Sequence, residues 1–569
     1  MQPGFEHDTT RRRRLRIVSS MAAAVVVAGI GLAGAAPAQA WPVGHGGDGR
    51  VGGHGHPGSG SSQQLTPRTQ FAMAPDGSSG ATQGGEGIPN IDVVKKTIAT
   101  YYGDPGTGMA NTTSSPYISE MDGIVARATA TLKPSYDRAI ARHEKPAIVF
   151  DADDTTLWTY DMEVGDMHFN YNPTEQDAWV QAAKFPATPA MVGFVNAAAA
   201  MGYTVFGLTG RNDDQKAATL TNLTNVGYTA FTADDFYTKW TGTGTSQQPS
   251  YITCATSSCT TVEYKALTRR HIERDLGYTI TLNVGDQWSD LQGGFAQSTL
   301  KLPNPTYYLP SPDLPGVSEP KLAPRTHFTM KADGSSGATQ GGDGIPNIDS
   351  VKKTIATYYG DPGTGIADTT SSPYISEMSR IVARQLPSLT ATCRHEKRSH
   401  HRPAVVFDAD DTTLWTYDME VGDMHFDYDP GEQDVWVQAA KFPATPSMVH
   451  LVNSLRQAGC TVVGLTGRND DQKTATLTNL WNVGYRGFTA TNYYTKWTGV
   501  GASQQPWYIR CAAASCTTIE YKSQTRAHVE SRSGGDYDIV ANFGDQFSDL
   551  IGGHADRTVK LPNPTYYLP

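Results

Sequence analysis

Short apolar runs alternate along this chain with longer stretches in which apolar positions recur at helical spacing. The runs Ala147–Phe150, Tyr203–Leu208 and Tyr278–Val284 have the length and continuity of buried strands. The segments Ile91–Tyr102 and Ala190–Met201 have the spacing of helices, and a glycine follows the second of them. Because strands alternate with helices, the pattern predicts an α/β fold with a parallel sheet flanked by helices.

The whole pattern occurs twice. The 20-residue block Phe150–Phe169 returns without a change as Phe407–Phe426, 257 positions later. The identical segments Lys301–Pro310 and Lys560–Pro569 lie 259 positions apart, so the second copy gains two residues before its last motif. Since each repeat is as long as a domain, the sequence predicts a tandem duplication rather than a solenoid of short repeats.

The repeat and the composition divide the chain into five segments. We expect a targeting segment at 1–40, a linker rich in glycine, serine and histidine at 41–66, and a first domain at 67–310. A proline-rich linker at 311–323 leads to a second domain at 324–569. The histidines of the first linker are interpreted as part of a solvated segment rather than as metal ligands.

The N-terminus has the three parts of a secretory signal. Arginines at Arg11–Arg14 precede an apolar region at Met21–Ala36, and Ala38–Ala40 reads as a small-residue cleavage site. We expect the mature chain to begin at Trp41, and the arginine cluster leaves a twin-arginine export route open. No later stretch is apolar enough to span a bilayer, so we expect a secreted protein without a stable membrane anchor.

Cysteine usage fits an exported protein, in which disulfides form and persist. Cys254 and Cys259 recur in the second half as Cys511 and Cys516, each pair separated by four residues. We expect one local disulfide in each half. A zinc site is less expected, because no second cysteine or histidine pair has a suitable spacing.

Two further cysteines occur only in the second half. Cys393 and Cys460 stand where the first half has Tyr136 and Tyr203. Since both occur in one copy and neither in the other, we hypothesise a third disulfide between them.

Composition excludes some classes of function. The net charge of -10 and the pI near 5.8 argue against a protein that binds nucleic acid through a basic face. With 38% hydrophobic residues, each half has enough apolar residues for a core of its own. We expect small-molecule partners rather than a nucleic acid polymer.

Polar residues follow the predicted strands, where ligands bind in open α/β sheets. In the first half these residues are Asp151, Asp153, Thr209, Asp286 and Asp290, and Lys265 joins the set from a segment well downstream of the second strand. The second half repeats it as Asp408, Asp410, Thr466, Lys522, Asp545 and Asp549. An isolated Asp-x-Asp or lysine is a weak signal, but an ordered set that occurs twice is a strong one.

These residue types suit phosphoryl transfer. A carboxylate can attack phosphorus, and a second carboxylate two residues later can act first as an acid and then as a base. A hydroxyl and an ammonium group can hold the phosphoryl oxygens as charge redistributes. Further carboxylates can hold Mg²⁺, which neutralises the phosphate.

The ordered set resembles the haloacid dehalogenase (HAD) superfamily. Gly-Asp-Gln-Trp-Ser-Asp at 285–290, preceded by Tyr-Lys at 264–265, resembles its secreted acid phosphatase branch, of class B or subfamily IIIB type. The resemblance covers residues 90–310 and 347–569 and implies two tandem Rossmann-like domains, each with a small helical cap. It also implies Mg²⁺-dependent hydrolysis of small phosphomonoesters through an aspartyl phosphate.

The same resemblance implies a role for each residue. It gives the nucleophiles and the acid/base residues as Asp151, Asp153, Asp408 and Asp410. It gives the phosphate-binding residues as Thr209, Lys265, Thr466 and Lys522. It gives the Mg²⁺-binding residues as Asp151, Asp153, Asp286, Asp290, Asp408, Asp410, Asp545 and Asp549, with the acid/base residues binding through their backbone carbonyls.

Several alternatives stay open at the level of single residues. Arg269 or Arg270 could replace Lys265 at the phosphate. Arg211 either contacts phosphate or pairs with an aspartate at 213–214. The side chains Trp158, Tyr160 and Met162 either contact the organic group of a substrate or pack in the core.

Two other functions remain as alternatives to hydrolysis. A phosphate-binding or storage protein could use the same fold, but both copies keep every predicted residue, which favours two active sites. A phosphotransferase would use the same residues and pass the phosphate to an alcohol instead of water.

Overall fold

We describe the computed structural model of this chain at residues 70–72, 88–319, 322, 327–329 and 345–568, all of which belong to one compact unit. The expected targeting segment, its cleavage site and the glycine-rich linker lie outside the described residues. Within these ranges, no helix is both long enough and apolar enough to cross a bilayer.

The first half contains a five-stranded sheet in the order β4-β3-β2-β5-β6, with every neighbouring pair parallel. Its strands are β2 Lys145–Phe150, β3 Thr204–Asn212, β4 Phe236–Lys239, β5 Tyr278–Gly285 and β6 Thr299–Lys301. The three strands predicted from apolar runs are confirmed as β2, β3 and β5. The edge strands β4 and β6 span only four and three residues, which is too short for a recognisable pattern.

The second half repeats this sheet in the order β10-β9-β8-β11-β12, again all parallel. Its strands are β8 Pro403–Phe407, β9 Thr461–Asn469, β10 Tyr493–Lys496, β11 Asp538–Gly544 and β12 Thr558–Lys560. In both sheets the middle strand is the one that leads into the identical block. The predicted α/β fold and its duplication are therefore confirmed.

Helices fill the connections between the strands. In the first half they are α2 Ile91–Tyr102, α3 Pro116–Ala141, α4 Pro173–Ala182, α5 Met191–Met201, α6 Lys216–Asn225, α7 Thr261–Arg274 and the short α8 Trp288–Leu291. In the second half they are α9 Ile348–Tyr359, α10 Pro373–Arg398, α11 Pro430–Ala439, α12 Met448–Gln457, α13 Lys473–Asn482, α14 Thr518–Glu530 and α15 Phe547–Leu550. The helix predicted at Ile91–Tyr102 is confirmed to the residue.

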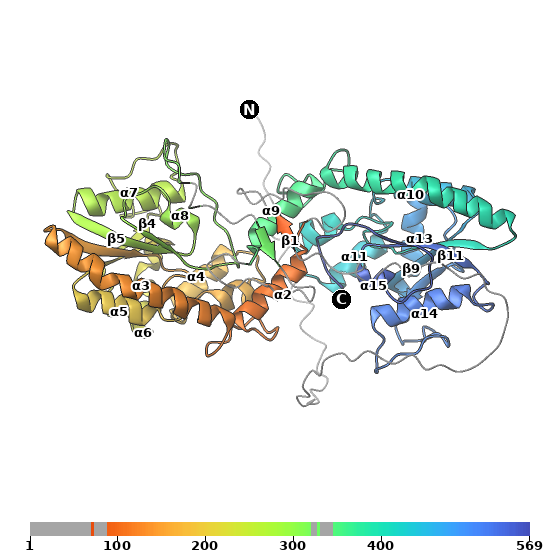
Figure 1. Cartoon of the computed structure of the whole chain (residues 1–569), viewed down its shortest axis with the longest axis horizontal. Coiled ribbons are helices and arrows are strands. Elements are labelled where there is room, and N and C mark those ends of the chain that lie inside the picture. Colours follow the sequence, from red (N-terminus) through yellow and green to blue (C-terminus); the bar gives the residue numbers. More distant parts are fainter. Residues whose placement is uncertain (1–69, 73–87, 320–321, 323–326, 330–344, 569) are drawn as a thin grey trace. The chain divides into compact units, whose positions relative to one another are not determined.

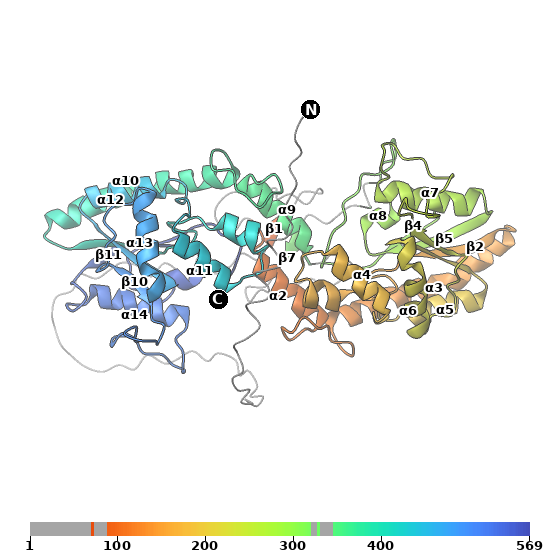
Figure 2. The ribbon, with the colours of Figure 1, turned by 180° about the vertical axis from the view of Figure 1, so that it is seen from behind.

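Helices cover both faces of each sheet. In the first half α7 lies on one face and α3 and α5 lie on the other (Figures 1 and 2). Side chains alternate along β2, so that Ala147 and Val149 join the core under α7, whereas Ile148 and Phe150 join the core on the opposite face. Because both faces of the strand are buried, its sequence is a continuous apolar run.

The structure confirms the three expected disulfides, and they use all six cysteines of the chain. In the second half one of them joins α10 to the start of β9. At the corresponding place in the first half, the rings of Tyr136 and Tyr203 pack edge to face, 5.2 Å apart. The pairs are Cys254–Cys259, Cys511–Cys516 and Cys393–Cys460.

Candidate active site

The carboxyl ends of three neighbouring strands bring the predicted residues of the first half together. Asp151 directly follows β2, and Asp286 directly follows β5. Thr209 lies inside β3, two residues beyond Gly207, the last residue of β3 that is paired with β2. The strand predicted to end at Leu208 is therefore too short, because the backbone stays extended through the Thr-Gly-Arg segment.

Lys265 reaches the same edge from α7. Its side chain is buried, and Nζ lies 2.8 Å from Oδ1 of Asp151 and 2.5 Å from Oδ1 of Asp290. Arg269, one turn further along α7, instead donates to the backbone carbonyls of residues 290, 292 and 294. Arg270 donates to the carbonyl of Tyr251. Of the three cations considered from the sequence, Lys265 is the one that faces the aspartates, while Arg269 fixes the loop after β5.

Three buried carboxylates form the most acidic part of this edge. Asp151, Asp286 and Asp290 each offer an oxygen, and these oxygens all lie within 4.8 Å of one another. One ammonium group, that of Lys265, faces two of them. Buried carboxylates in excess of their cationic partners are costly without a further positive charge, and oxygen-only donors suit a hard divalent cation. The residues present therefore fit a site for a hard divalent cation.

The pKa values reflect the same crowding. Burial raises the pKa of Asp151 well above its usual range; the ammonium of Lys265 opposes this rise, and the carboxylates of Asp290 and Asp286 add to it. Burial and the neighbouring Asp290 raise the pKa of Asp286 to about 6. The two carboxylates in contact with Lys265 outweigh its burial and raise its pKa, so it remains an ammonium group.

Asp153 is held by an arginine rather than by the lysine. The guanidinium of Arg211 contacts both of its carboxylate oxygens, with Nη2 2.5 Å from Oδ1 and Nε 3.1 Å from Oδ2. Arg211 also donates from Nη1 to the hydroxyl of Thr219 at 2.9 Å. Of the two alternatives for Arg211, pairing with an aspartate at 213–214 is wrong, because Arg211 pairs with Asp153 instead.

A strained turn separates Asp151 from the rest of the block. Asp154 has a left-handed backbone with φ of 47°, a conformation that aspartate tolerates better than most residues. Its carboxylate accepts from the amide of Thr159 at 3.1 Å and from the hydroxyl of the same residue. Burial and the nearby Asp286 raise the pKa of Asp154 to about 8. These contacts give Asp154 a structural role in the turn.

Two residues that the sequence reasoning missed bind Asp286 directly. Oδ2 of Asp286 accepts from Nδ2 of Asn304 at 2.8 Å and from the hydroxyl of Tyr307 at 3.2 Å. Gln287 adds a third donor at 2.8 Å. The sequence signal that could have revealed Asn304 and Tyr307 is the segment Lys301–Pro310, which recurs unchanged at the end of the second repeat. The strand before it, β6, is too short to be recognised from the sequence.

The close approach of Asp290 to β5 requires a glycine. A Cβ on Gly285 would lie 2.4 Å from Cβ of Asp290, where no real side chain fits. Oδ2 of Asp290 accepts from the amide of Gln287 at 2.9 Å, and this contact fixes the turn. In the Gly-Asp-Gln-Trp-Ser-Asp motif, packing therefore requires the glycine, and the two aspartates belong to the candidate site.

The aromatic residues of the block belong to the core. Trp158, Tyr160 and Met162 are all buried. The ring of Trp158 packs 5.1 Å from that of Tyr117 in α3, and Tyr160 packs 4.3 Å from Tyr102 in α2. These contacts favour the packing interpretation over contact with a substrate.

The second half reproduces these contacts. Nζ of Lys522 lies 2.8 Å from Asp408 and 2.5 Å from Asp549, and Asn563 donates to Asp545 at 2.8 Å. Its buried acidic group is Asp408, Asp545 and Asp549. The contacts of Arg468 with Asp410 match those of Arg211 with Asp153.

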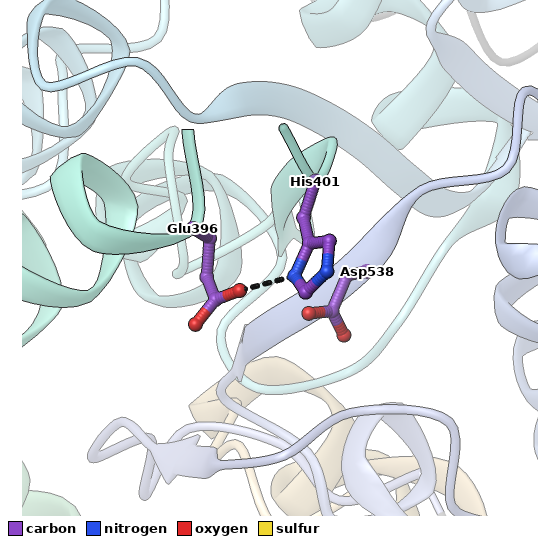
Figure 3. Close-up of side chains that lie close together, drawn as sticks. All are labelled: Glu396, His401 and Asp538. Carbon is purple, nitrogen blue, oxygen red and sulfur yellow. Dashed lines mark hydrogen bonds and ion pairs between the residues drawn. The ribbon is translucent and has the colours of Figure 1, made fainter. Parts of the chain in front are cut away.

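A third group of potential metal ligands in the described part of the chain is of a different kind. Figure 3 shows His401 between Glu396 and Asp538 of the second half. Nδ1 of His401 lies 2.5 Å from one carboxylate oxygen of Glu396, and His395 lies 3.1 Å from the other. Hydrogen bonds from both histidines lower the pKa of Glu396. Both histidines are exposed, and we interpret the group as a local ion-pair network at the end of α10.

Comparison with known proteins identifies one family. The model of the HAD superfamily, subfamily IIIB (acid phosphatase), matches residues 94–310 and again residues 364–569. The two matches cover both sheets and every residue of the two candidate sites.

Plant proteins are among the similar sequences. Over 178 residues the chain is 34% identical to the stem 28 kDa glycoprotein of Glycine max. This match covers 31% of this chain and 64% of the relative. It is 32% identical to acid phosphatase 1 of Solanum lycopersicum, over 29% of this chain and 60% of the relative. It is 29% identical to vegetative storage protein 1 of Arabidopsis thaliana, over 29% of this chain and 55% of the relative. The chain thus spans less than two thirds of the length of these relatives.

Among solved structures, a class C acid phosphatase from Bacillus anthracis matches with 21% identity and a TM-score of 0.27. The match covers 38% of this chain and 86% of the bacterial one.

Proposed function

Because this chain belongs to subfamily IIIB of the HAD superfamily, the acid phosphatases, we propose that it hydrolyses small phosphate monoesters at two sites. The observation that carries the proposal is the contact of Lys265 with both Asp151 and Asp290 at the end of the central strand. The contact supports the proposal because it joins the residues that we propose as nucleophile, phosphate-binding cation and metal ligand. The second half offers the same arrangement.

The first step transfers the phosphoryl group to the protein. A carboxylate oxygen of Asp151 attacks phosphorus, an aspartyl phosphate forms, and the bond from phosphorus to the ester oxygen breaks. The protonated carboxyl group of Asp153 gives its proton to the departing alkoxide. Arg211 contacts both oxygens of Asp153 and so fixes the position of this side chain.

The second step releases phosphate. Water attacks phosphorus, its proton passes to the carboxylate of Asp153, and the bond from phosphorus to Asp151 breaks. The hydroxyl of Thr209 and the ammonium of Lys265 would bind the phosphoryl oxygens in both steps. Asp151 and Asp153 are thereby returned to their starting states.

Mg²⁺ is the proposed cofactor. Asp151, Asp286 and Asp290 would hold it, together with the backbone carbonyl of Asp153. When bound, it neutralises negative charge on the phosphate and helps to orient it. Asn304 and Tyr307 hold the Asp286 carboxylate from behind, as supporting residues do at metal sites.

Storage is the second candidate function, favoured by the names of the Arabidopsis vegetative storage proteins among the relatives. Both halves of this chain keep the candidate nucleophile, acid/base residue, phosphate ligands and metal ligands. A protein that served storage alone would have no need to keep these residues in the same arrangement twice. We therefore place hydrolysis ahead of storage.

We also propose that the protein is exported. Its three disulfides suit an oxidising compartment, and its first 40 residues have the pattern of a cleaved signal. N-terminal sequencing of the secreted protein should begin at Trp41, and recovery of the intact N-terminus in the cytosol would contradict the proposal.

The proposed reaction is tested by phosphate release from an aryl phosphate with Mg²⁺ and, in parallel, with a chelator. We expect turnover in Mg²⁺ that the chelator abolishes and added Mg²⁺ restores. Glycerol in the same assay measures transfer to an alcohol: a hydrolase releases free phosphate as its main product, whereas a phosphotransferase yields mainly glycerol phosphate. Absence of turnover by the folded protein across several esters and pH values would favour storage.

A further inference from the structure

The N-terminal elements of the two halves contact each other. Strand β1 Gln70–Ala72 in the first half pairs antiparallel with β7 His327–Thr329 in the second. The helices that follow them, α2 and α9, pack against each other. Apolar residues of both helices, including Ile91 and Ile348, belong to one continuous buried cluster.

The start of α9 is bonded to the end of the first half. Asn347 caps α9 through its side-chain oxygen. Its amide nitrogen donates to the carbonyl oxygens of Asn304 at 3.1 Å and Tyr307 at 2.6 Å. The backbone amide of Ile348 adds a bond of 2.9 Å to the carbonyl of Pro305. One asparagine thus closes its own helix and holds a loop of the other half.

Two charged residues of α9 extend this contact. Oδ2 of Asp349 accepts from the backbone amide of Tyr308 at 3.0 Å. Nζ of Lys352 donates to the carbonyl of Phe169, the last residue of the repeated block. Both ends of the first site, the block after β2 and the loop after β6, are therefore tied to α9.

In the same way, the start of α2 in the first half is hydrogen-bonded to the loop at the end of the second half. The amide nitrogen of Asn90, the cap of α2, donates to the carbonyl oxygens of Asn563 at 3.1 Å and Tyr566 at 2.7 Å. The backbone amide of Ile91 lies 2.9 Å from the carbonyl of Pro564. The exchange is reciprocal, residue for residue.

The loops held in this way lead directly to the candidate metal ligands. Asn304 and Tyr307 accept hydrogen bonds from Asn347 through their backbone carbonyls. The side chains of the same two residues donate to Asp286, at 2.8 Å and 3.2 Å respectively. In the second half, Asn563 and Tyr566 bind Asp545 at 2.8 and 3.1 Å. One short loop therefore connects the helix cap of each half to the metal-binding end of the other half's site.

We propose that the two sites are crossed: α9 of the second half positions the site of the first, and α2 of the first half positions the site of the second. Asn347 and Asn90 are the positioning residues. The inference rests on the proposed function to the extent that Asp286 and Asp545 bind the metal. It makes the duplicated chain a fused pair in which a helix of each half holds the loop that supports the other half's site.

The test uses two backgrounds in which one site is silenced. Asp408→Asn leaves the first site active, and Asp151→Asn leaves the second. Asn347→Ser keeps an acceptor for the cap of α9 but removes the amide donor. We expect Asn347→Ser to lower kcat/KM or raise the Mg²⁺ requirement by about tenfold when only the first site is active, and by less than about twofold when only the second is. Asn90→Ser should give the opposite pattern.

Asn172→Ser is the matched control. Asn172 also caps a helix through its side-chain oxygen, at the start of α4, and is partly exposed. It should change neither background by more than about twofold, as expected for a substitution that keeps the cap. An Asn347→Ser effect confined to the second site, or equal at both sites, would overturn the proposal, because general damage to the fold does not select the opposite half.

Amide hydrogen exchange of the metal-free protein supplies a readout that is independent of turnover. Asn347→Ser should speed exchange at the amides of residues 306–308 but not at 565–567, and Asn90→Ser should do the reverse. Unchanged exchange in both segments would refute the crossed arrangement even in an active enzyme. If no background released phosphate, the proposed function would fail, and the exchange pattern alone would decide this inference.

Discussion

At the scale of single residues, the proposed chemistry of the first site depends on one buried ammonium group, that of Lys265. Lys265 contacts Asp151 and Asp290, and its ammonium group opposes the rise that burial causes in the pKa of Asp151. A buried charge of this kind is strongly unfavourable once its partner is removed. The same ammonium group would bind the phosphoryl oxygens during the reaction.

Replacing Lys265 by methionine should therefore affect the first site alone. In the Asp408→Asn background we expect Lys265→Met to lower kcat by about 10²- to 10³-fold, the usual cost of a lost donor to developing negative charge. Steady-state kinetics with an aryl phosphate measure this. Lys133→Met, which removes an exposed lysine from a surface ion pair, is the control and should leave kcat unchanged. A fall of less than about threefold in kcat would remove Lys265 from the proposed chemistry.

The sequence predicted the six residues of each site because each lies in a short motif with a chemical meaning. It did not predict the contact of Arg211 with Asp153, since that contact depends on β3 continuing to Asn212. Nor did it predict Asn304, which reaches Asp286 from a loop 18 residues downstream. Contacts made by irregular loops leave no periodic pattern in a sequence.

At the scale of elements, the central strands were predictable and the edges were not. The central β2 is buried on both faces and gives a continuous apolar run, whereas β4 and β6 pair on only one side and are short. The long α3 was also not predicted, although Pro116 at its first turn and the cap Ser115 are ordinary start signals. Its few buried positions are spread over 26 residues, which dilutes the apolar pattern.

The disulfide between α10 and the start of β9 makes a prediction for one half only. Changing both Cys393 and Cys460 to serine should lower the stability of the second half by about 2–4 kcal/mol, since a closed loop of this size restricts the unfolded chain. Hydrogen exchange, recorded separately for the two halves as the temperature rises, measures this loss of stability. Tyr136→Phe in the first half, which keeps the ring pair with Tyr203, is the control and should change little. An equal loss of stability in both halves would contradict a local effect of the disulfide.

At the scale of the whole molecule, two copies of one site lie in a single compact unit. The duplication is plain in the sequence, but the crossed contacts between α2, α9 and the ends of the halves are not. Both copies of the terminal segment are identical, so nothing in the sequence indicates which helix docks on which loop. That choice is made by tertiary packing.

The metal-free molecule should become less stable as pH rises. Burial raises the pKa of Glu163 to about 8, and it also raises the pKa of its counterpart Glu420. A carboxyl group whose pKa is higher in the folded state contributes stability that is complete below its unfolded pKa and is lost as pH rises through the folded one. Calorimetry in chelator should therefore show the Tm falling between about pH 5 and pH 8.

Glutamine at both positions should remove part of that fall. We expect Glu163→Gln with Glu420→Gln to raise the Tm at pH 8 by about 2 °C or more and to change it little at pH 5. Glu175→Gln, at an exposed position on α4, is the control. A Tm of the double variant that tracks the wild type across the range would show that these carboxyls do not titrate as their burial requires.

The central claim is that both halves hydrolyse phosphate esters through Asp151 and Asp408. The most direct measurement is Mg²⁺-dependent phosphate release by the wild type, Asp151→Asn, Asp408→Asn and the double variant, each with its folding checked by circular dichroism. The account predicts partial loss in each single variant and no turnover in the double variant. A double variant that keeps the wild-type rate, or a folded wild type without turnover on any ester, would contradict it.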